Sequence, residues 1–466
     1  MTILPSCPWN NPMAYPKGSY QAFGSTLLAF CHRGVIFILG LLLSFKSHAI
    51  ELFDNVQIHG FASQALILTS GNNLFGSSIS NPSLDFTELG INGSWSPSPN
   101  LRLSMQVLSR RAGSWSDGTP VIDFGLLDYS HHFDQDYRLG IRAGRVRQPY
   151  GIYNDTRDVA FTRPSILLPQ SIYLETVRDF SISGDGLLIY GESRKPWGNL
   201  TLELVGGYPR TGEVDNQFAF SPERLPGSLE PNLSFDGRLN YQTYDGSLRL
   251  ALSGFYASAN YKPSNGNWIE PITGKPRLEP KGGLIAFNSM LLSAQYNTEH
   301  WTLTSEYSPN FFQGTGLNTL DNPFRNFNNF GQSYYFQAAY RFAPQWELMA
   351  RYDAAYPNSH DQSGQATEAK YQNLVNQYIA NNPTVFDGYA GAVKAYNLRL
   401  QLPPAYSQFA KTLTVGIRYD LTPTIMLRAE YNYINGTAWL PAQDNPRPAE
   451  TAQYWNMFGF LVSLRF

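Results

Sequence analysis

The last twelve residues, WNMFGFLVSLRF at positions 455–466, read as two distinct faces. From Phe458 onward every second residue is large and apolar, up to the terminal Phe466, and the residues between them are Gly459, Leu461, Ser463 and Arg465. A period of two indicates a β-strand, in which successive side chains point to opposite sides. Such a strand can belong to the wall of a membrane β-barrel or close a soluble β-sandwich. The choice between these two folds depends on the rest of the chain.

The composition of the 466-residue chain excludes a helical membrane protein. The mean hydropathy is -0.29, and no run of about 20 apolar residues occurs, which is the length that a membrane-spanning helix needs. Strands of a membrane barrel do not stand out in mean hydropathy, because lipid-facing and lumen-facing residues alternate along them. The 29 Tyr and 29 Phe residues suit such a barrel, whose interface girdles are aromatic.

Residues 1–49 are predicted to form a secretory signal peptide. The apolar run Gly34–Phe45 is too short to span a membrane, follows a basic flank and precedes a small-residue end, which is the order found in signal peptides. Cleavage is expected after Ala49, which leaves 50–466 as the barrel domain, and an anchoring helix is the alternative. The residues ahead of His32 look like an over-long start, and Met13 offers another start.

The predicted mature chain contains no cysteine, because Cys7 and Cys31 both lie in the segment that would be removed. Avoidance of thiols fits a protein that crosses an oxidising periplasm unfolded. The removed segment holds three of the 34 basic residues and none of the 36 acidic ones, so the mature charge is about -5. Nothing in this balance points to a nucleic-acid partner.

From Ile50 onward the chain alternates between short tight turns and long polar loops, the connection pattern of a membrane barrel. The predicted strands are about Gln57–Thr69, Phe86–Trp95, Leu101–Arg110, Ile122–Phe133, Tyr137–Arg147, Ser181–Glu192, Leu200–Tyr208, Ser234–Gln242, Leu248–Ala257, Gly283–Thr298, Trp301–Ser308, Tyr334–Phe342, Trp346–Tyr356, Leu413–Leu421, Ile425–Asn435 and the closing strand. The predicted fold class is therefore all-β: a transmembrane antiparallel up-and-down β-barrel of about 16 strands, with both ends in the periplasm.

The stretch Val393–Leu402 also alternates and threatens this strand count. Counting it alone gives an odd number and reverses the direction of Leu413–Leu421. We therefore expect it to lie in a long seventh loop from Pro357 to about Lys411, together with the helix-like Ala366–Ile379. A barrel of 18 strands that uses this stretch and an unseen partner is the alternative.

The chain after residue 49 resembles Gram-negative outer-membrane porins of the 16-stranded trimeric type. Its terminal Phe466 is similar to the residue that the barrel assembly machinery reads in closing strands of outer-membrane barrels. The motifs in Gly144–Gly151, Thr162–Pro164, Leu168–Gln170, Val415–Asp420 and Ala429–Tyr431 are similar to the porin group that includes phosphate-selective channels. Those channels use a ladder of basic residues, whereas the arginines here are scattered and no Lys-rich loop occurs.

This resemblance implies a channel for passive diffusion of small hydrophilic solutes or ions, surrounded by lipid of the bacterial outer membrane and assembled as a homotrimer. In trimeric general-diffusion porins the third external loop folds back into the lumen and forms the constriction. Counting strands from a periplasmic amino terminus makes about 148–179 the third external loop. The resemblance therefore implies that this loop lies in the lumen.

Charges on the lumen face and on the infolded loop are the groups that select ions and orient dipolar solutes in a channel. A basic wall that faces loop aspartates would create a transverse field, and Arg142, at mid-strand, is the best candidate for a pore-lining charge. Gly140 and Gly144 leave room beside it for something to pass or pack. For Arg157 and Asp158 the alternative is a pair that only pins the loop to the wall. The predicted pore-lining and constriction residues are Arg102, Arg142, Asp155, Arg157, Asp158, Arg163, Arg178, Asp179, Arg418 and Arg428.

Enzymatic motifs do not occur in the sequence. The five histidines after residue 49 lie outside the frames of hydrolases and metalloproteases, and no P-loop, Rossmann fingerprint or EF-hand is found. The adjacent pair His131 and His132 would point to opposite faces of a strand, so it predicts no metal site. The sequence thus predicts a non-enzymatic protein without cofactor or metal. An outer-membrane barrel enzyme such as a lipid hydrolase, and a plugged structural or adhesive barrel, are the alternatives.

Overall fold

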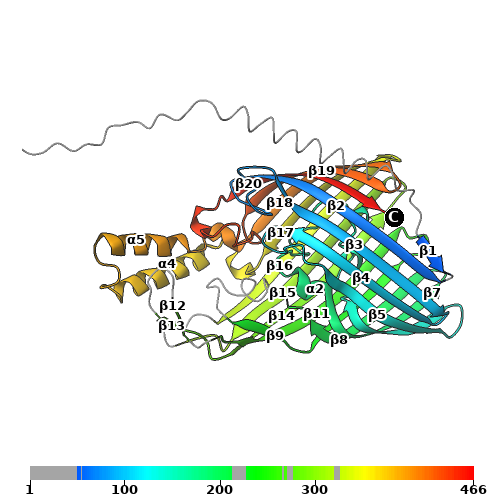
Figure 1. Ribbon diagram of the computed structural model, residues 1–466, viewed down its shortest axis with the longest axis horizontal. Helices are drawn as coiled ribbons and strands as arrows, with labels where there is room; N and C mark the ends of the chain where they lie inside the picture. Colours follow the sequence, from blue (N-terminus) through cyan, green and yellow to red (C-terminus); the bar gives the residue numbers. More distant parts are fainter. Residues whose placement is uncertain (1–49, 54, 212–226, 265–266, 270–275, 320–325) are drawn as a thin grey trace, which may run out of the picture. The chain divides into compact units, whose positions relative to one another are not determined.

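The computed structural model describes residues 50–53, 55–211, 227–264, 267–269, 276–319 and 326–466 (Figure 1). The predicted signal peptide, residues 1–49, lies outside the described residues. The part of the chain that the structure describes is dominated by β-strands, as the period-two patterns predicted.

Sixteen long strands in the described ranges form the barrel wall. They are β2 (Val56–Ser70), β3 (Ser83–Ser98), β4 (Leu101–Ala112), β5 (Val121–His132), β6 (Tyr137–Arg147), β7 (Ser183–Lys195), β8 (Gly198–Pro209), β10 (Ser234–Gln242), β11 (Leu248–Lys262), β14 (Gly283–Asn297), β15 (Trp301–Thr315), β16 (Phe327–Ala343), β17 (Trp346–Tyr356), β18 (Ala410–Thr422), β19 (Ile425–Gly436) and β20 (Tyr454–Arg465). Each is antiparallel to the next. The predicted number of strands is confirmed.

The barrel closes where the first long strand meets the last. Strands β2 and β20 pair over ten residues from Phe61↔Arg465 to Ser70↔Asn456. The backbone N–H of Phe466 donates to the carbonyl of Gly60 at 3.0 Å, and the N–H of Gly60 donates back at 3.1 Å. Gly60 makes room for the terminal side chain, because a Cβ there would lie 2.4 Å from the Phe466 ring. The terminal aromatic residue is therefore part of the seam.

Four short strands accompany the barrel in the part of the chain that the structure describes. Strand β1 (Ile50–Phe53) pairs with β2, and β9 (Ser228–Pro231) pairs with β11, while β12 (Asn267–Ile269) and β13 (Pro276–Leu278) form a separate hairpin. The connections between long strands alternate between tight turns at one end of the barrel and long loops at the other. We call these the short-turn end and the long-loop end.

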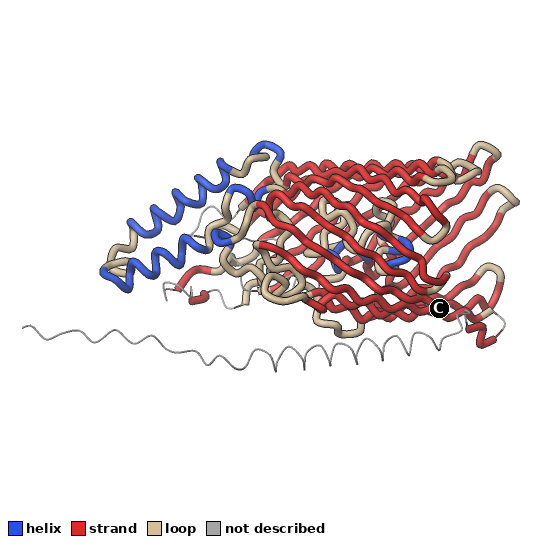
Figure 2. The backbone as a smooth tube through the Cα atoms, turned by 90° about the horizontal axis from the view of Figure 1, so that it is seen from above, coloured by secondary structure: helices blue, strands red, loops and turns tan. Residues whose placement is uncertain are grey.

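The seventh long loop holds two helices, α4 (Gln365–Ala380) and α5 (Gly388–Leu400), which project past the strands at the long-loop end (Figures 1 and 2). The predicted helix Ala366–Ile379 is confirmed. The alternating stretch Val393–Leu402 lies mostly in α5, whose first turn is capped by the Asp387 side chain. The 18-stranded alternative that used this stretch is therefore wrong. No helix in the described ranges is long and apolar enough to cross a membrane.

The wall has an apolar outer face and a polar inner face. In β20, Phe460 on the outer face is 50% exposed, whereas Leu461 on the inner face is 1% exposed. The same alternation places Leu89 and Ile91 outside and Glu88 inside in β3. Aromatic pairs such as Trp301–Tyr340 and Trp346–Tyr419 stand near the short turns. An apolar outer band with aromatic girdles matches lipid.

A hydrophobic core lies against the inner face of the seam. Loop side chains Leu74, Phe75, Trp115, Ile166 and Trp439 pack together against inward-facing residues of the wall, which are Ala65, Ile67, Phe86, Met426, Ile434, Met457 and Leu461. Four loops contribute to this core, although they are far apart in the sequence. Burial of this apolar surface stabilises the loops in fixed positions.

Candidate functional site

Residues 148–182 connect β6 to β7 and include about 148–179, the stretch predicted to form the third external loop. Two single 3₁₀ turns, Asn154–Thr156 and Ala160–Thr162, and the short helix α2 (Arg178–Ile182) give it local order. Most of its residues are buried, which is unusual for a loop. We call this stretch segment 148–182 and describe its attachments to the wall in turn.

The first attachment is a buried carboxylate in β15. The Tyr173 hydroxyl donates to Glu306 Oε2 at 2.7 Å, and the Ile152 N–H donates to Oε1 at 3.1 Å. Two wall residues complete the donor set, Tyr335 at 2.9 Å and Ser293 at 2.6 Å. Among the described residues no cation forms an ion pair with Glu306. The four hydrogen bonds therefore replace the water that a charged carboxylate would otherwise bind.

The second attachment uses arginines of the wall and carbonyl groups of the segment. Arg428 in β19 donates to the carbonyls of Ser165 at 3.0 Å and Arg163 at 2.8 Å. Arg351 in β17 donates to the Leu167 carbonyl at 3.2 Å, and Glu430 accepts from the Ile166 N–H at 2.7 Å. These contacts satisfy backbone groups that a buried loop would otherwise leave unpaired.

The third attachment is a network of ion pairs at β3 and β4. Arg163 is bonded to both oxygens of Glu88, at 2.6 and 3.3 Å, and Glu175 pairs with Arg110 at 2.6 Å and with Arg157 at 3.1 Å. Burial by itself raises the pKa of Glu175, but Arg110, Arg157 and Arg178 lower it to about 2. The carboxylate is therefore ionised at neutral pH and holds the arginines in place.

A second buried carboxylate of the segment, Asp158, lies between two arginines. It is ion-paired with Arg147 at 2.7 Å and with Arg178. Burial raises its pKa, but these two guanidinium groups lower the pKa well below its usual range. Asp158 thereby links the end of β6 to helix α2 at the two ends of the segment.

The fourth attachment leads to a row of alternating charges along the wall. Asp155 pairs with Arg238 of β10 at 2.8 Å, and Arg238 pairs with Glu203 of β8 at 2.7 Å. Arg142 of β6 lies 3.8 Å from Glu203 and donates to Asp128 of β5 at 3.0 Å. We call Asp128, Arg142, Glu203, Arg238 and Asp155 the charge row. Its partly exposed members are Arg142 and Asp155, whose side chains are 30% and 40% exposed.

The predicted constriction residues fall into two groups in the structure. Arg157, Asp158, Arg163, Arg178 and Arg428 are buried in the attachments described above. For Arg157 and Asp158 this burial favours the pinning role. Exposed surface remains on Arg142, Asp155, Asp179, Arg418 and Arg102. Of these, Arg418 donates to the Phe161 carbonyl at 3.1 Å, whereas Arg102 contacts Ser96 beside a short turn, away from the segment.

Several residues of these attachments were not singled out from the sequence. They are Arg110, Asp128, Arg147, Tyr173, Glu203 and Glu306. Face alternation carries a signal for the wall residues: Glu203 stands between Leu202 and Leu204, and Asp128 stands between Leu127 and Tyr129. A single charged residue among apolar neighbours in a barrel strand faces inward. Within the described ranges no cluster of His, Cys, Asp and Glu could hold a metal ion.

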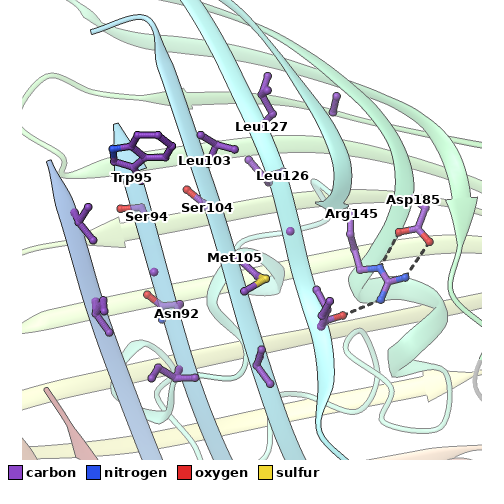
Figure 3. A pocket seen from close by; sticks show the side chains of 18 residues that line it. Asn92, Ser94, Trp95, Leu103, Ser104, Met105, Leu126, Leu127, Arg145 and Asp185 are labelled. Atoms are coloured by element: carbon purple, nitrogen blue, oxygen red, sulfur yellow. Dashed lines mark hydrogen bonds and ion pairs between the residues drawn. The ribbon is translucent and has the colours of Figure 1, made fainter. Parts of the chain in front are cut away.

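The outer face of β2 to β7 bears a broad apolar groove (Figure 3). It is lined by Trp95, Leu103, Met105 and Leu127, and at one edge by Arg145. The Arg145 guanidinium donates to both oxygens of Asp185, at 2.7 and 2.9 Å. This ion pair lies on the outer side of the wall and is separate from the charge row.

No protein-family model matches the sequence, and no curated protein matches it. Solved structures do resemble it. OmpT of Vibrio cholerae has a TM-score of 0.50 at 11% identity over 90% of this chain and all of its own. OprB of Pseudomonas putida has a TM-score of 0.49 at 11% identity, over 88% of this chain and 93% of its own. An anion-selective porin from Comamonas acidovorans has a TM-score of 0.47 at 12% identity, over 88% of this chain and 98% of its own. At such identity the likeness is one of fold: the chain has the closed 16-stranded barrel of outer-membrane proteins.

Proposed function

We propose that the chain is an outer-membrane channel for passive diffusion of small hydrophilic solutes and ions, in which segment 148–182 folds into the lumen and narrows it. The observation that carries this proposal is that residues two apart in the segment bind walls on opposite sides. Tyr173 is bonded to Glu306 of β15 and Glu175 to Arg110 of β4. These strands stand eight places apart in the ring of sixteen.

The exposure of the charge row supports a position for the solute path through the lumen. Inward-facing charges in β3, β4, β17 and β19 are buried by the segment, whereas Arg142 and Asp155 keep solvent-exposed surface. A solute would therefore pass along β5 to β10, between Arg142 on the wall and Asp155 on the segment. Fixed charges of opposite sign beside a narrow aqueous path act on ions and dipoles.

A homotrimer is part of the proposal. Its support is the resemblance of the sequence to trimeric porins and the ion pair Arg145–Asp185 on the outer face. Charged groups facing lipid are costly in the bilayer and cost less near its interfaces. A neighbouring subunit over the groove in Figure 3 would cover this pair. Cross-linking of the protein in native membranes measures the number of subunits.

The experiment that tests the channel uses substituted cysteines, because residues 50–466 contain none. Asp155→Cys is placed in a planar bilayer, and single-channel conductance is recorded before and after adding a charged methanethiosulfonate reagent. We expect steady steps that the reagent reduces. Ile189→Cys on the outer face is the matched control and should not respond. Unchanged steps in the Asp155→Cys protein would contradict the proposed position of the segment.

A plugged barrel is the second candidate, favoured by the hydrophobic core that four loops build against the seam. The same recordings separate the two functions. A folded, heat-modifiable barrel that conducts no ions supports the plugged barrel, and it would direct attention to adhesion or to hydrolysis of lipid. Conducting steps support the channel.

A further inference from the structure

The room that Gly140 leaves on the inner face of β6 is filled by a tyrosine ring. Gly140 and Tyr190 of β7 are direct partners in the sheet. A Cβ on Gly140 would lie 2.3 to 2.5 Å from three atoms of the Tyr190 ring and hydroxyl. The ring therefore lies flat across the glycine backbone, and any other residue at position 140 would displace it.

Two guanidinium groups lie on this ring. The Cζ atom of Arg142 is 4.6 Å from the ring centroid of Tyr190, and that of Arg138 is 5.2 Å from it. Both arginines are two residues from Gly140 and share its inward face, and their side chains are 30% and 26% exposed. A cation is attracted to the face of an aromatic ring, so the ring holds each guanidinium near a fixed place.

The hydroxyl of the same tyrosine fixes Arg142 a second time. It donates to Asp128 Oδ1 at 2.8 Å, and the other oxygen of Asp128 accepts from Arg142 Nε at 3.0 Å. Tyr190 thus binds Arg142 directly through its face and indirectly through Asp128. The Nη1 atom of Arg142 lies 3.8 Å from Glu203, the next acid of the charge row.

We propose that Tyr190 is a positioning residue of the channel: it holds Arg138 and Arg142 as a stacked pair on the lumen wall and so sets the ion preference that these charges impose. This inference rests on the proposed function. An arginine side chain that is free to move averages its charge over many positions, whereas a stacked one presents its charge at one place along the path. Gly140 and Tyr190 act together, because the glycine leaves room for the ring and the ring holds the two arginines.

Two variants that remove the ring from its place in different ways test the positioning role of Tyr190. Tyr190→Leu removes the ring, and Gly140→Ala expels an intact ring. Both should shift the reversal potential in a salt gradient in the same direction as Arg142→Gln, and both should add noise to the open-channel current. Tyr190→Phe keeps the ring and should retain most of the wild-type preference. Tyr129→Leu, on the outer face of β5, is the matched control.

A second measurement does not depend on conduction. Phenylglyoxal modifies accessible arginines, and its rate at Arg138 and Arg142 can be followed by mass spectrometry on the folded full chain in detergent. We expect a rate several-fold higher in Tyr190→Leu and Gly140→Ala than in wild type or Tyr129→Leu. Equal rates in folded variants would overturn the positioning role. Faster modification in a barrel that does not conduct would keep the positioning role and reject the channel.

Discussion

Tyr173 of segment 148–182 and Glu306 of β15 are joined by a hydrogen bond of 2.7 Å, although they are 133 residues apart in the sequence. The same Tyr173 oxygen accepts from the backbone N–H groups of Ile152 and Tyr153, at 2.9 and 3.1 Å. One hydroxyl therefore ties two turns of the segment to each other and to the wall. Burial raises the pKa of Tyr173 well above its usual value, so that the hydroxyl keeps its proton.

Replacement of Tyr173 by Phe should loosen the segment. The change removes one donor from Glu306 and leaves the Tyr153 N–H without its acceptor, whereas the Ile152 N–H keeps its bond to Glu306. An unsatisfied buried group costs about 1–3 kcal/mol. We expect a loss of that size in unfolding free energy, measured with urea in lipid vesicles, and faster proteolysis within 148–182. Tyr129→Phe, on the outer face, is the control. An unchanged proteolysis rate would show that other attachments suffice.

Replacement of Arg142 by Gln should make the channel more selective for cations. The acids Asp128 and Glu203 remain in the charge row, so the local charge becomes more negative by one. One unit charge at roughly 9 Å in water lowers the energy of a cation by about 0.5 kcal/mol and raises that of an anion by the same amount, which predicts about a fivefold rise in the cation-to-anion permeability ratio. Reversal potentials in a salt gradient measure this ratio, with Arg447→Gln in an external loop as the control. A shift toward anions would contradict the placement of Arg142.

Arg428 cannot be replaced by Lys without loss. Its guanidinium donates to three carbonyls of the segment, those of Ala160, Arg163 and Ser165. An ammonium group is a compact point charge and does not reproduce this fork. We expect Arg428→Lys to destabilise the protein by about 1–3 kcal/mol. Lys411→Arg, at the long-loop end of the adjacent strand β18, is the control and should leave the urea midpoint unchanged. Equal stability of Arg428→Lys would show that these carbonyls find other donors.

The attachment at Glu175 should withstand mild acid. Its pKa is lowered from 4.5 to about 2 on folding, so the folded state favours the ionised form. The stability that this group contributes is complete above about pH 4.5 and is lost as the pH falls to about 2. Hydrogen exchange of the segment amides, corrected for the intrinsic rate, should therefore stay slow at pH 5 and rise only below about pH 4. A rise between pH 7 and pH 5 would contradict this prediction.

The barrel could be predicted from the sequence because its rule is local. In each strand the alternation of apolar and polar residues shows which side chains face lipid and which face the lumen. Three strands have the predicted bounds: Tyr137–Arg147, Ser234–Gln242 and Trp346–Tyr356. Several other strands extend further at the long-loop end: β15 runs to Thr315 rather than Ser308. Polar residues there no longer alternate with lipid-facing ones, so the pattern fades while the backbone pairing continues.

The attachments of the segment could not be predicted in the same way. Their acceptors are often backbone carbonyls, as for Arg428 and Arg351, and carbonyls leave no trace in a sequence. The ion pair Arg163–Glu88 joins residues 75 apart, and its formation depends on the path of the whole segment. Gly140 gave a partial signal: the sequence indicated free space beside Arg142, but not that Tyr190 fills it.

The seam between β2 and β20 has a consequence for the timing of assembly. Its side chains meet across 400 residues, as in the Ser63–Ser463 hydrogen bond. Asn72 and Asn73 reach across the same seam to Ala452 and Asn445. Until β20 takes its place between them, β2 and β19 are both open edges that can pair with other chains. Closure of the barrel therefore waits for the carboxyl-terminal strand, and the assembling chain is exposed to wrong strand pairing until then.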